Sequence, residues 1–124
     1  MISDSELDVL RAYDNPEHNR LSVYLRLDTP DRRQAAYEHF LQQVRLCLDS
    51  RDPRRMLREI IQEDIEITSQ YINCNADRSG AGLAIFSCAS DLFWRAYSLP
   101  IPIPSQVAVG PRFDIEPLLQ AVTS

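Results

Sequence analysis

The stretch LSVYLRL, residues 21–27, alternates strictly between four apolar residues and the residues Ser22, Tyr24 and Arg26. This period of two is typical of a half-buried β-strand that turns one apolar face toward a core. Such a face must be buried against other elements of the chain. The stretch therefore predicts the first strand of a sheet, and the flanking sequence indicates what covers it.

Two long helices are predicted directly after this strand, over residues 30–49 and 53–73. Each begins with a capping residue followed by a proline, in Thr29-Pro30 and in Asp52-Pro53. Their apolar residues recur at helical spacing, Tyr37, Phe40, Leu41, Val44 and Leu48 in the first helix and Leu57, Ile60, Ile61, Ile65, Thr68 and Ile72 in the second. Because only the short segment 49–52 joins them, we expect an antiparallel hairpin.

Three further strands are expected over residues 83–87, 93–99 and about 103–109, after a loop over residues 73–82. Ser90-Asp91 turns the first pair, and short links favour antiparallel pairing of all three strands. The prolines of residues 100–104 cannot donate ladder hydrogen bonds, so this run is extended, at an edge, or a link between strands.

Short helices are predicted at both ends of the chain. Ser3 to Glu6 has the form of a capping box and precedes a helix over residues 4–13, and Asp114 caps a helix over residues 115–122. The predicted order is αβααβββα. It defines an α+β class, with a mostly antiparallel four-stranded sheet packed against the long helical hairpin, in a single domain over residues 1–124.

Composition and charge exclude several functional classes. Of 124 residues, 44% are hydrophobic and 25% charged, as in ordinary globular domains. The net charge is −5 and all thirteen basic residues are arginines, which excludes a globally basic nucleic-acid binder. There is no apolar run long enough to span a membrane and the N-terminus is acidic and polar, so we expect a cytoplasmic protein without a membrane partner.

No constellation of catalytic residues is recognisable, so we expect no enzyme, no metal and no cofactor. Cys47, Cys74 and Cys88 contain no CxxC pair, and His18 and His39 lie far in the sequence from Cys74 and Cys88, so we expect buried, reduced thiols. The sequence has no nucleophile elbow, P-loop or HExxH motif, and Gly80-Ala81-Gly82 is too short for a dinucleotide loop. The acidic residues of the second long helix, Glu59, Glu63, Asp64 and Glu66, are interpreted as a solvated face.

Arginines gather where the two long helices meet. The RNA- or phosphate-binding residues that we predict are Ser50, Arg51, Arg54, Arg55 and Arg58, and we call this set the arginine tip. A helix N-terminus already offers unpaired N–H groups and partial positive charge, which guanidinium groups would reinforce. An ordinary solvated helix end is the alternative interpretation, and Asp49 and Asp52 favour it.

Two segments, GLAIFSC at residues 82–88 and VAVGPRFDIEPLL at residues 107–119, resemble the N-terminal domain of the archaeo-eukaryotic release factor and Pelota superfamily, in its bacterial branch. GLAIFSC, residues 82–88, resembles the family's Gly-Leu-hydrophobic strand that ends in a small residue. VAVGPRFDIEPLL, residues 107–119, contains the family's basic-Phe-x-x-x-x-Leu motif before a helix. Residues 21–25 resemble the first strand of the family, and the helical hairpin occupies the expected place.

The resemblance implies a non-catalytic role. The release factors read the stop codon with an Asn-Ile-Lys-Ser signature between the two long helices, which residues 50–55 lack. Only Phe113 remains of a second signature, Tyr-x-Cys-x-x-x-Phe, at residues 107–113. The Gly-Gly-Gln tripeptide that promotes peptidyl-tRNA hydrolysis belongs to the next domain of the family and does not occur here.

The resemblance further implies that this chain contacts the ribosome or rRNA, in rescue, hibernation or translation-related regulation, and that further domains of a longer chain follow. A protein-interaction domain that keeps the fold and has lost RNA binding is the alternative. The net charge of −5, the absence of lysine and the missing signatures favour that alternative.

Overall fold

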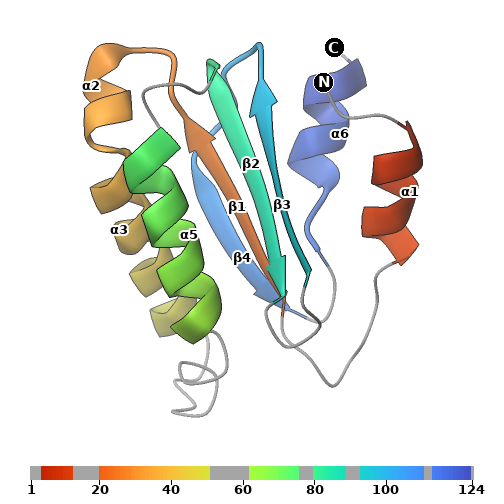
Figure 1. Ribbon diagram of the computed structural model, residues 1–124, viewed down its shortest axis with the longest axis horizontal. Helices are drawn as coiled ribbons and strands as arrows, with labels where there is room; N and C mark the ends of the chain where they lie inside the picture. Colours follow the sequence, from red (N-terminus) through yellow and green to blue (C-terminus); the bar gives the residue numbers. More distant parts are fainter. Residues whose placement is uncertain are drawn as a thin grey trace.

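A four-stranded antiparallel sheet lies between two layers of helices (Figure 1). The computed structural model describes residues 4–12, 20–50, 62–75, 80–88, 93–110 and 113–123. The strands are β1 (Arg20–Arg26), β2 (Gly82–Cys88), β3 (Phe93–Leu99) and β4 (Gln106–Gly110). The helices are α1 (Asp4–Ala12), α2 (Pro30–Gln34), α3 (Ala36–Ser50), α5 (Gln62–Asn75) and α6 (Glu116–Thr123). The predicted α+β class and four-stranded antiparallel sheet are confirmed.

The strand order is β3-β2-β1-β4, so β1 and β2 are the two central strands. β2 and β3 pair as the predicted antiparallel neighbours. The expectation that all three C-terminal strands pair in succession is wrong, because β4 pairs with β1, with Leu21 opposite Val109 and Val23 opposite Val107. The chain thus crosses from one edge of the sheet to the other between β3 and β4.

Residues 100–105 make this crossing. Three inter-strand steps of about 4.8 Å separate the edge strands, a distance that six extended residues can span. The link passes close to β2, since a Cβ atom on Gly82 would lie 2.7 Å from the carbonyl oxygen of Ile101. The N–H of Arg26 donates to Ser105 Oγ at 3.0 Å and holds the far end of the link. β4 therefore begins at Gln106, later than predicted.

α3 and α5 cover one face of the sheet and enclose the first hydrophobic core. Its buried residues are Leu21, Val23, Leu25, Leu27, Ala36, Phe40, Val44, Ile72, Leu83, Ile85 and Val109. They include the apolar face predicted for residues 21–27 and residues from both predicted helical stripes. Burying one such large side chain stabilises the fold by about 1.5–3 kcal/mol, so this core holds the hairpin on the sheet.

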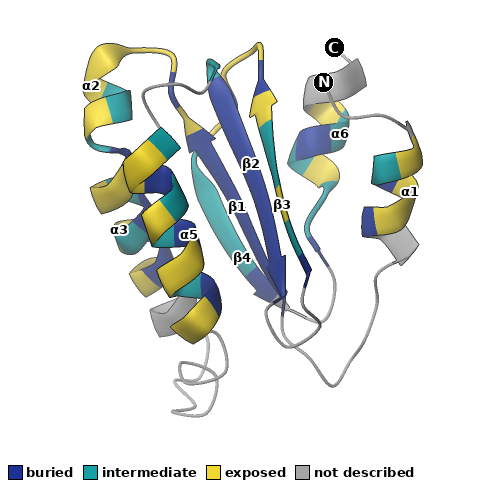
Figure 2. Cartoon of the chain, viewed as in Figure 1, coloured by how far each residue is buried: buried dark blue, intermediate teal, exposed yellow. Residues whose placement is uncertain are grey.

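α1 and α6 cover the opposite face, and both central strands are consequently buried on both sides (Figure 2). The second core contains Leu7, Leu10, Tyr24, Ala84, Phe86, Cys88, Phe93, Leu99, Ile103, Phe113 and Leu118. The prediction of a half-buried first strand is therefore wrong: Ser22 and Tyr24 are 1% and 0% exposed. Both are polar because they hydrogen-bond to the backbone of Asp114 rather than to water.

The helix predicted over residues 30–49 is two helices, α2 and α3, separated at Ala35. Thr29 caps α2 as predicted, with its hydroxyl accepting a hydrogen bond from the N–H three residues later. Arg33 Nε donates to the carbonyl oxygen of Leu27 at 2.8 Å and ties α2 to the end of β1. α2 buries no side chain, so the break separates an exposed turn of helix from the core helix α3.

α3 and α5 form the predicted hairpin within the described residues. They are in contact and run antiparallel, with the end of α3 and the start of α5 at the same end of the molecule (Figure 1). The helix predicted over residues 53–73 is described from Gln62 onward and continues to Asn75. Its first part, residues 53–61, lies outside the described residues.

Candidate functional site

Most of the arginine tip lies outside the described residues. Ser50 is the last residue of α3, whereas Arg51, Arg54, Arg55 and Arg58 belong to residues 51–61. The two helix ends that this segment joins lie close to the same end of the molecule (Figure 1). The structure thus describes the two helix ends, Ser50 and Gln62, between which the four arginines lie in the sequence. That the arginines form a phosphate-binding site stays a prediction.

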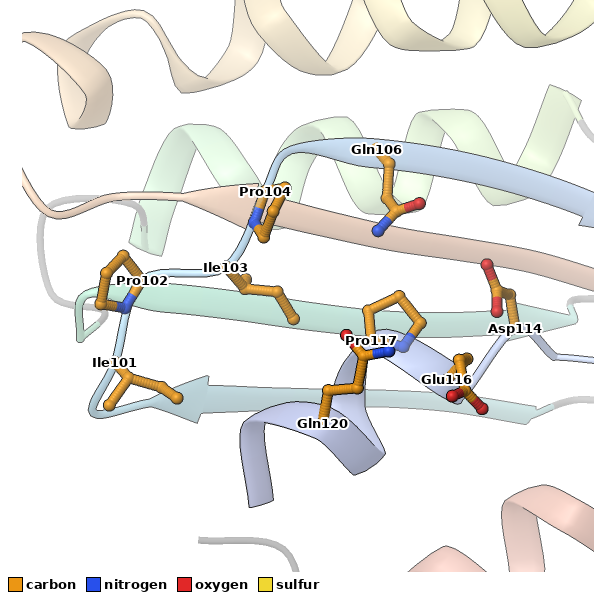
Figure 3. A pocket seen from close by; sticks show the side chains of 9 residues that line it. All are labelled: Ile101, Pro102, Ile103, Pro104, Gln106, Asp114, Glu116, Pro117 and Gln120. Carbon is orange, nitrogen blue, oxygen red and sulfur yellow. The ribbon is translucent and has the colours of Figure 1, made fainter. Parts of the chain in front are cut away.

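A groove of about 550 Å³ lies between the proline-rich link, the start of β4 and the start of α6 (Figure 3). We call it the α6 groove, and its lining residues are Ile101, Pro102, Ile103, Pro104, Gln106, Asp114, Glu116, Pro117 and Gln120. The link and Pro117 supply apolar surface, and the other four residues supply two carboxylates and two carboxamides. Its volume is within the range of about 300–1,000 Å³ that is common for ligand sites.

Asp114 is fixed at the rim of this groove by hydrogen bonds from its main chain to β1. Its N–H donates to Ser22 Oγ at 2.9 Å, and its carbonyl oxygen accepts from the phenol of Tyr24. Because both partner side chains are buried, moving this backbone would break buried hydrogen bonds. Neither bond uses the Asp114 carboxylate, which remains available to the groove.

The α6 groove is negatively charged. Asp114 and Glu116 are its only charged lining residues, and neither carboxylate forms an ion pair with another described residue. Burial and, second, the nearby Asp114 carboxylate raise the pKa of the Tyr24 phenol. A concave surface with this charge suits a cation and disfavours phosphate.

No family model matches the chain, and no curated protein matches it. The features of this chain that bear on its function are therefore the α6 groove, the arginine tip and the sequence resemblance.

A second group of arginines lies at the end of β1 and on α2, but Asp28 neutralises part of its charge. Arg26 Nε and Nη2 donate to the two Asp28 carboxylate oxygens at 3.0 and 3.1 Å, and Arg32 Nε lies 3.6 Å from one of them. The hydrogen bond from Arg26 is the main cause of the lowered pKa of Asp28. This group is thus a surface ion-pair network rather than an open phosphate site.

The acidic residues of α5 do not share one environment. Glu63 and Glu66 are exposed, as predicted for a solvated face, whereas Asp64 is buried and accepts a hydrogen bond from the buried Ser87 hydroxyl of β2. The interpretation of Asp64 as a solvated residue is therefore wrong. Glu59 lies outside the described residues, and among those described no group of three or more His, Cys, Asp or Glu is suited to a metal ion.

The cysteines are only partly as predicted. Cys88 is buried, but Cys74 is exposed in the last turn of α5, so the expectation of buried thiols is wrong there. The Cys47 side chain lies outside the described part of the chain. Cys88 belongs to the core under α1 and α6, and the sheet separates it from His39 of α3 on the other face. No helix among the described residues is long and apolar enough to cross a membrane.

Sequence reasoning missed the α6 groove entirely. In the sequence, its lining residues belong to two separate features, the extended proline run and the cap of the last helix. They meet because β4 returns to the far side of β1, which brings Gln106 opposite the start of α6 (Figure 3). Asp114 was a recognisable signal as a capping residue, but local pattern contains no information about which strand β4 joins.

Proposed function

We propose that this chain is a non-catalytic domain of a release-factor-like protein that contacts the ribosome or rRNA through the arginine tip. The observation that carries the proposal is that the end of α3 and the start of α5, which residues 51–61 join in the sequence, lie at the same end of the domain. The sequence resemblance supports the same role, since the equivalent connection in the release factors contacts the decoding site.

Local charge supports RNA contact at this end despite the acidic chain. Residues 51–61 contain four arginines and two acidic residues, Asp52 and Glu59, which gives the segment a charge of +2 within a chain of −5. Arginine donates bidentate, planar hydrogen bonds to phosphate and stacks on bases. The interaction would therefore be confined to the tip, with the rest of the surface repelling RNA.

Anchoring of the hairpin supports the same proposal. Phe40 and Val44 of α3 are buried in the core against the sheet. Near the start of α5, Ile65 packs against the same core and the buried Asp64 accepts a hydrogen bond from Ser87 of β2. The helix ends on both sides of residues 51–61 are thus attached to a packed scaffold, which lowers the entropic cost of presenting a short segment to a partner.

A protein-interaction domain that has lost RNA binding is the second candidate. The α6 groove favours it, because its two carboxylates without ion-pair partners among the described residues suit a basic protein segment. The two candidates predict different behaviour toward ribosomes, so one experiment separates them.

Co-sedimentation with purified ribosomes tests the proposal. We expect the chain to pellet with ribosomes at low salt and the double variant R54E/R55E to stay in the supernatant. The matched control is R32E/R95E, which changes the net charge equally at two described positions away from residues 51–61. Equal pelleting of both variants would contradict the arginine tip, and failure of the unmodified chain to pellet would favour the protein-interaction candidate.

A further inference from the structure

We propose that the α6 groove binds an extended segment of a partner protein that carries arginine or lysine next to apolar side chains. This inference does not depend on RNA binding by the arginine tip, because the groove and residues 51–61 share no residue. Three features of the groove support it: its rigid walls, its negative charge and its shape.

The walls of the groove are rigid. Pro102, Pro104 and Pro117 have fixed φ angles, and they line the groove from both sides. Ile103 is buried in the core beneath the link, and Gly82 allows the link to lie directly on β2. A groove that is already formed loses little conformational entropy when a ligand binds, which favours specific binding.

The charge of the groove selects a cationic ligand. Asp114 and Glu116 lie on the lead-in and first turn of α6, and no basic residue is present in the lining. A guanidinium or ammonium group could pair with these carboxylates through charge-assisted hydrogen bonds. The aliphatic stem of the same side chain would pack on Ile101 and the prolines, because long basic side chains are amphipathic.

The form of the groove favours an extended peptide. Gln106 points from β4 toward α6, and Gln120 lies on the opposite wall (Figure 3). The carboxamide of Gln106 offers both a donor and an acceptor, which is the pair that a peptide backbone requires. Gln106 is also the first residue of an edge strand of the sheet, so an extended segment could leave the groove along β4.

A titration followed by amide NMR chemical shifts tests this proposal on the 124-residue chain. The probe is the acetylated and amidated pentapeptide Leu-Arg-Leu-Arg-Leu, and its control has citrulline in place of both arginines. We expect saturable shifts for Gln106, Glu116 and Gln120 with the arginine peptide, and affinity lower by about tenfold with the citrulline peptide.

Charge-neutralising variants give the matched comparison. We expect D114N/E116Q to weaken binding of the arginine peptide by about tenfold while keeping the fold, since the hydrogen bonds of Asp114 to β1 come from its main chain. The control D31N/E38Q removes the same charge from a separate depression beside α2 and should bind normally.

Three results would overturn the proposal. One is the absence of saturable shifts at millimolar peptide, and another is equal affinity of the citrulline peptide or of D114N/E116Q. The third is saturation by free agmatine as readily as by the peptide, which would indicate a site for small cations. Since D114N/E116Q should still pellet with ribosomes, this test can fail or succeed independently of the proposed function.

Discussion

The phenol of Tyr24 donates a hydrogen bond to the backbone carbonyl oxygen of Asp114, which lies 90 residues later in the chain. The bond joins the central strand β1 to the start of α6 and so connects the sheet with the rim of the α6 groove. Tyr24 is fully buried, and its ring packs edge-on against Phe86 at a centroid distance of 5.9 Å. No water can readily replace this phenol.

Replacing Tyr24 by phenylalanine should lower the free energy of unfolding by about 1–3 kcal/mol. The substitution removes the donor and leaves a buried carbonyl oxygen without its partner. Urea denaturation of the variant measures the loss as a lower midpoint at unchanged slope. The control Y37F changes a phenol on a residue that is 36% exposed and should leave the midpoint unchanged. Equal midpoints for Y24F and the unmodified chain would contradict the role of this bond.

Alkaline pH should destabilise the fold through the same residue. Burial, and to a lesser extent the Asp114 carboxylate, raise the pKa of Tyr24 above its ordinary value of 10.0. The unfolded chain therefore loses the phenol proton first as pH rises, so the stabilisation present below that value declines above it. The expected decline is about 1.4 kcal/mol per pH unit for one proton.

Urea denaturation at a series of pH values between about 9 and 11 measures this decline. The comparison with Y24F isolates Tyr24, because the other tyrosines, including the half-buried Tyr97 whose pKa is also raised, are common to both proteins. The absence of lysine removes the usual competing titration in this range. Equal slopes for the two proteins would rule out Tyr24 as the source.

Ser87 should contribute more to stability than its size indicates. Its hydroxyl donates to the Asp64 carboxylate, and the two residues are 1% and 2% exposed. Ser87→Ala would remove a hydrogen bond from a buried acidic side chain, at a cost of about 1.5–3 kcal/mol. The control Ser98→Ala removes an exposed acceptor of the Gly80 N–H and should cost less than about 1 kcal/mol. Similar losses for both variants in urea denaturation would contradict a buried Asp64–Ser87 pair.

Local sequence pattern predicts which residues form helices and strands in this fold. It does not predict which of these elements contact one another. Alternation in residues 21–27 and helical spacing around Phe40 and Ile72 predicted strand, hairpin and core correctly. The same alternation also predicts a solvated second face, and this prediction is wrong. Ser22 and Tyr24 are polar but buried, because their hydroxyl groups form hydrogen bonds with the backbone of Asp114. That contact is long-range and has no signature within the strand.

The candidate sites show the same division. The arginine tip is contiguous in the sequence and could be proposed from charge alone, but its side chains lie in residues that the structure does not describe. The α6 groove requires Gln106 to meet Asp114 and Glu116, which depends on β4 crossing to β1. A proline run predicts an extended link, but it does not predict which edge of the sheet the link reaches.

The most direct test of the proposed function is the salt dependence of ribosome binding. Each arginine that pairs with an RNA phosphate steepens the fall of log K with log salt concentration by about 0.7–0.9. We therefore expect R54E/R55E to weaken binding and to reduce the slope by about 1.4–1.8, while R32E/R95E retains the slope of the unmodified chain. Equal slopes for all three proteins would contradict RNA contact through the arginine tip.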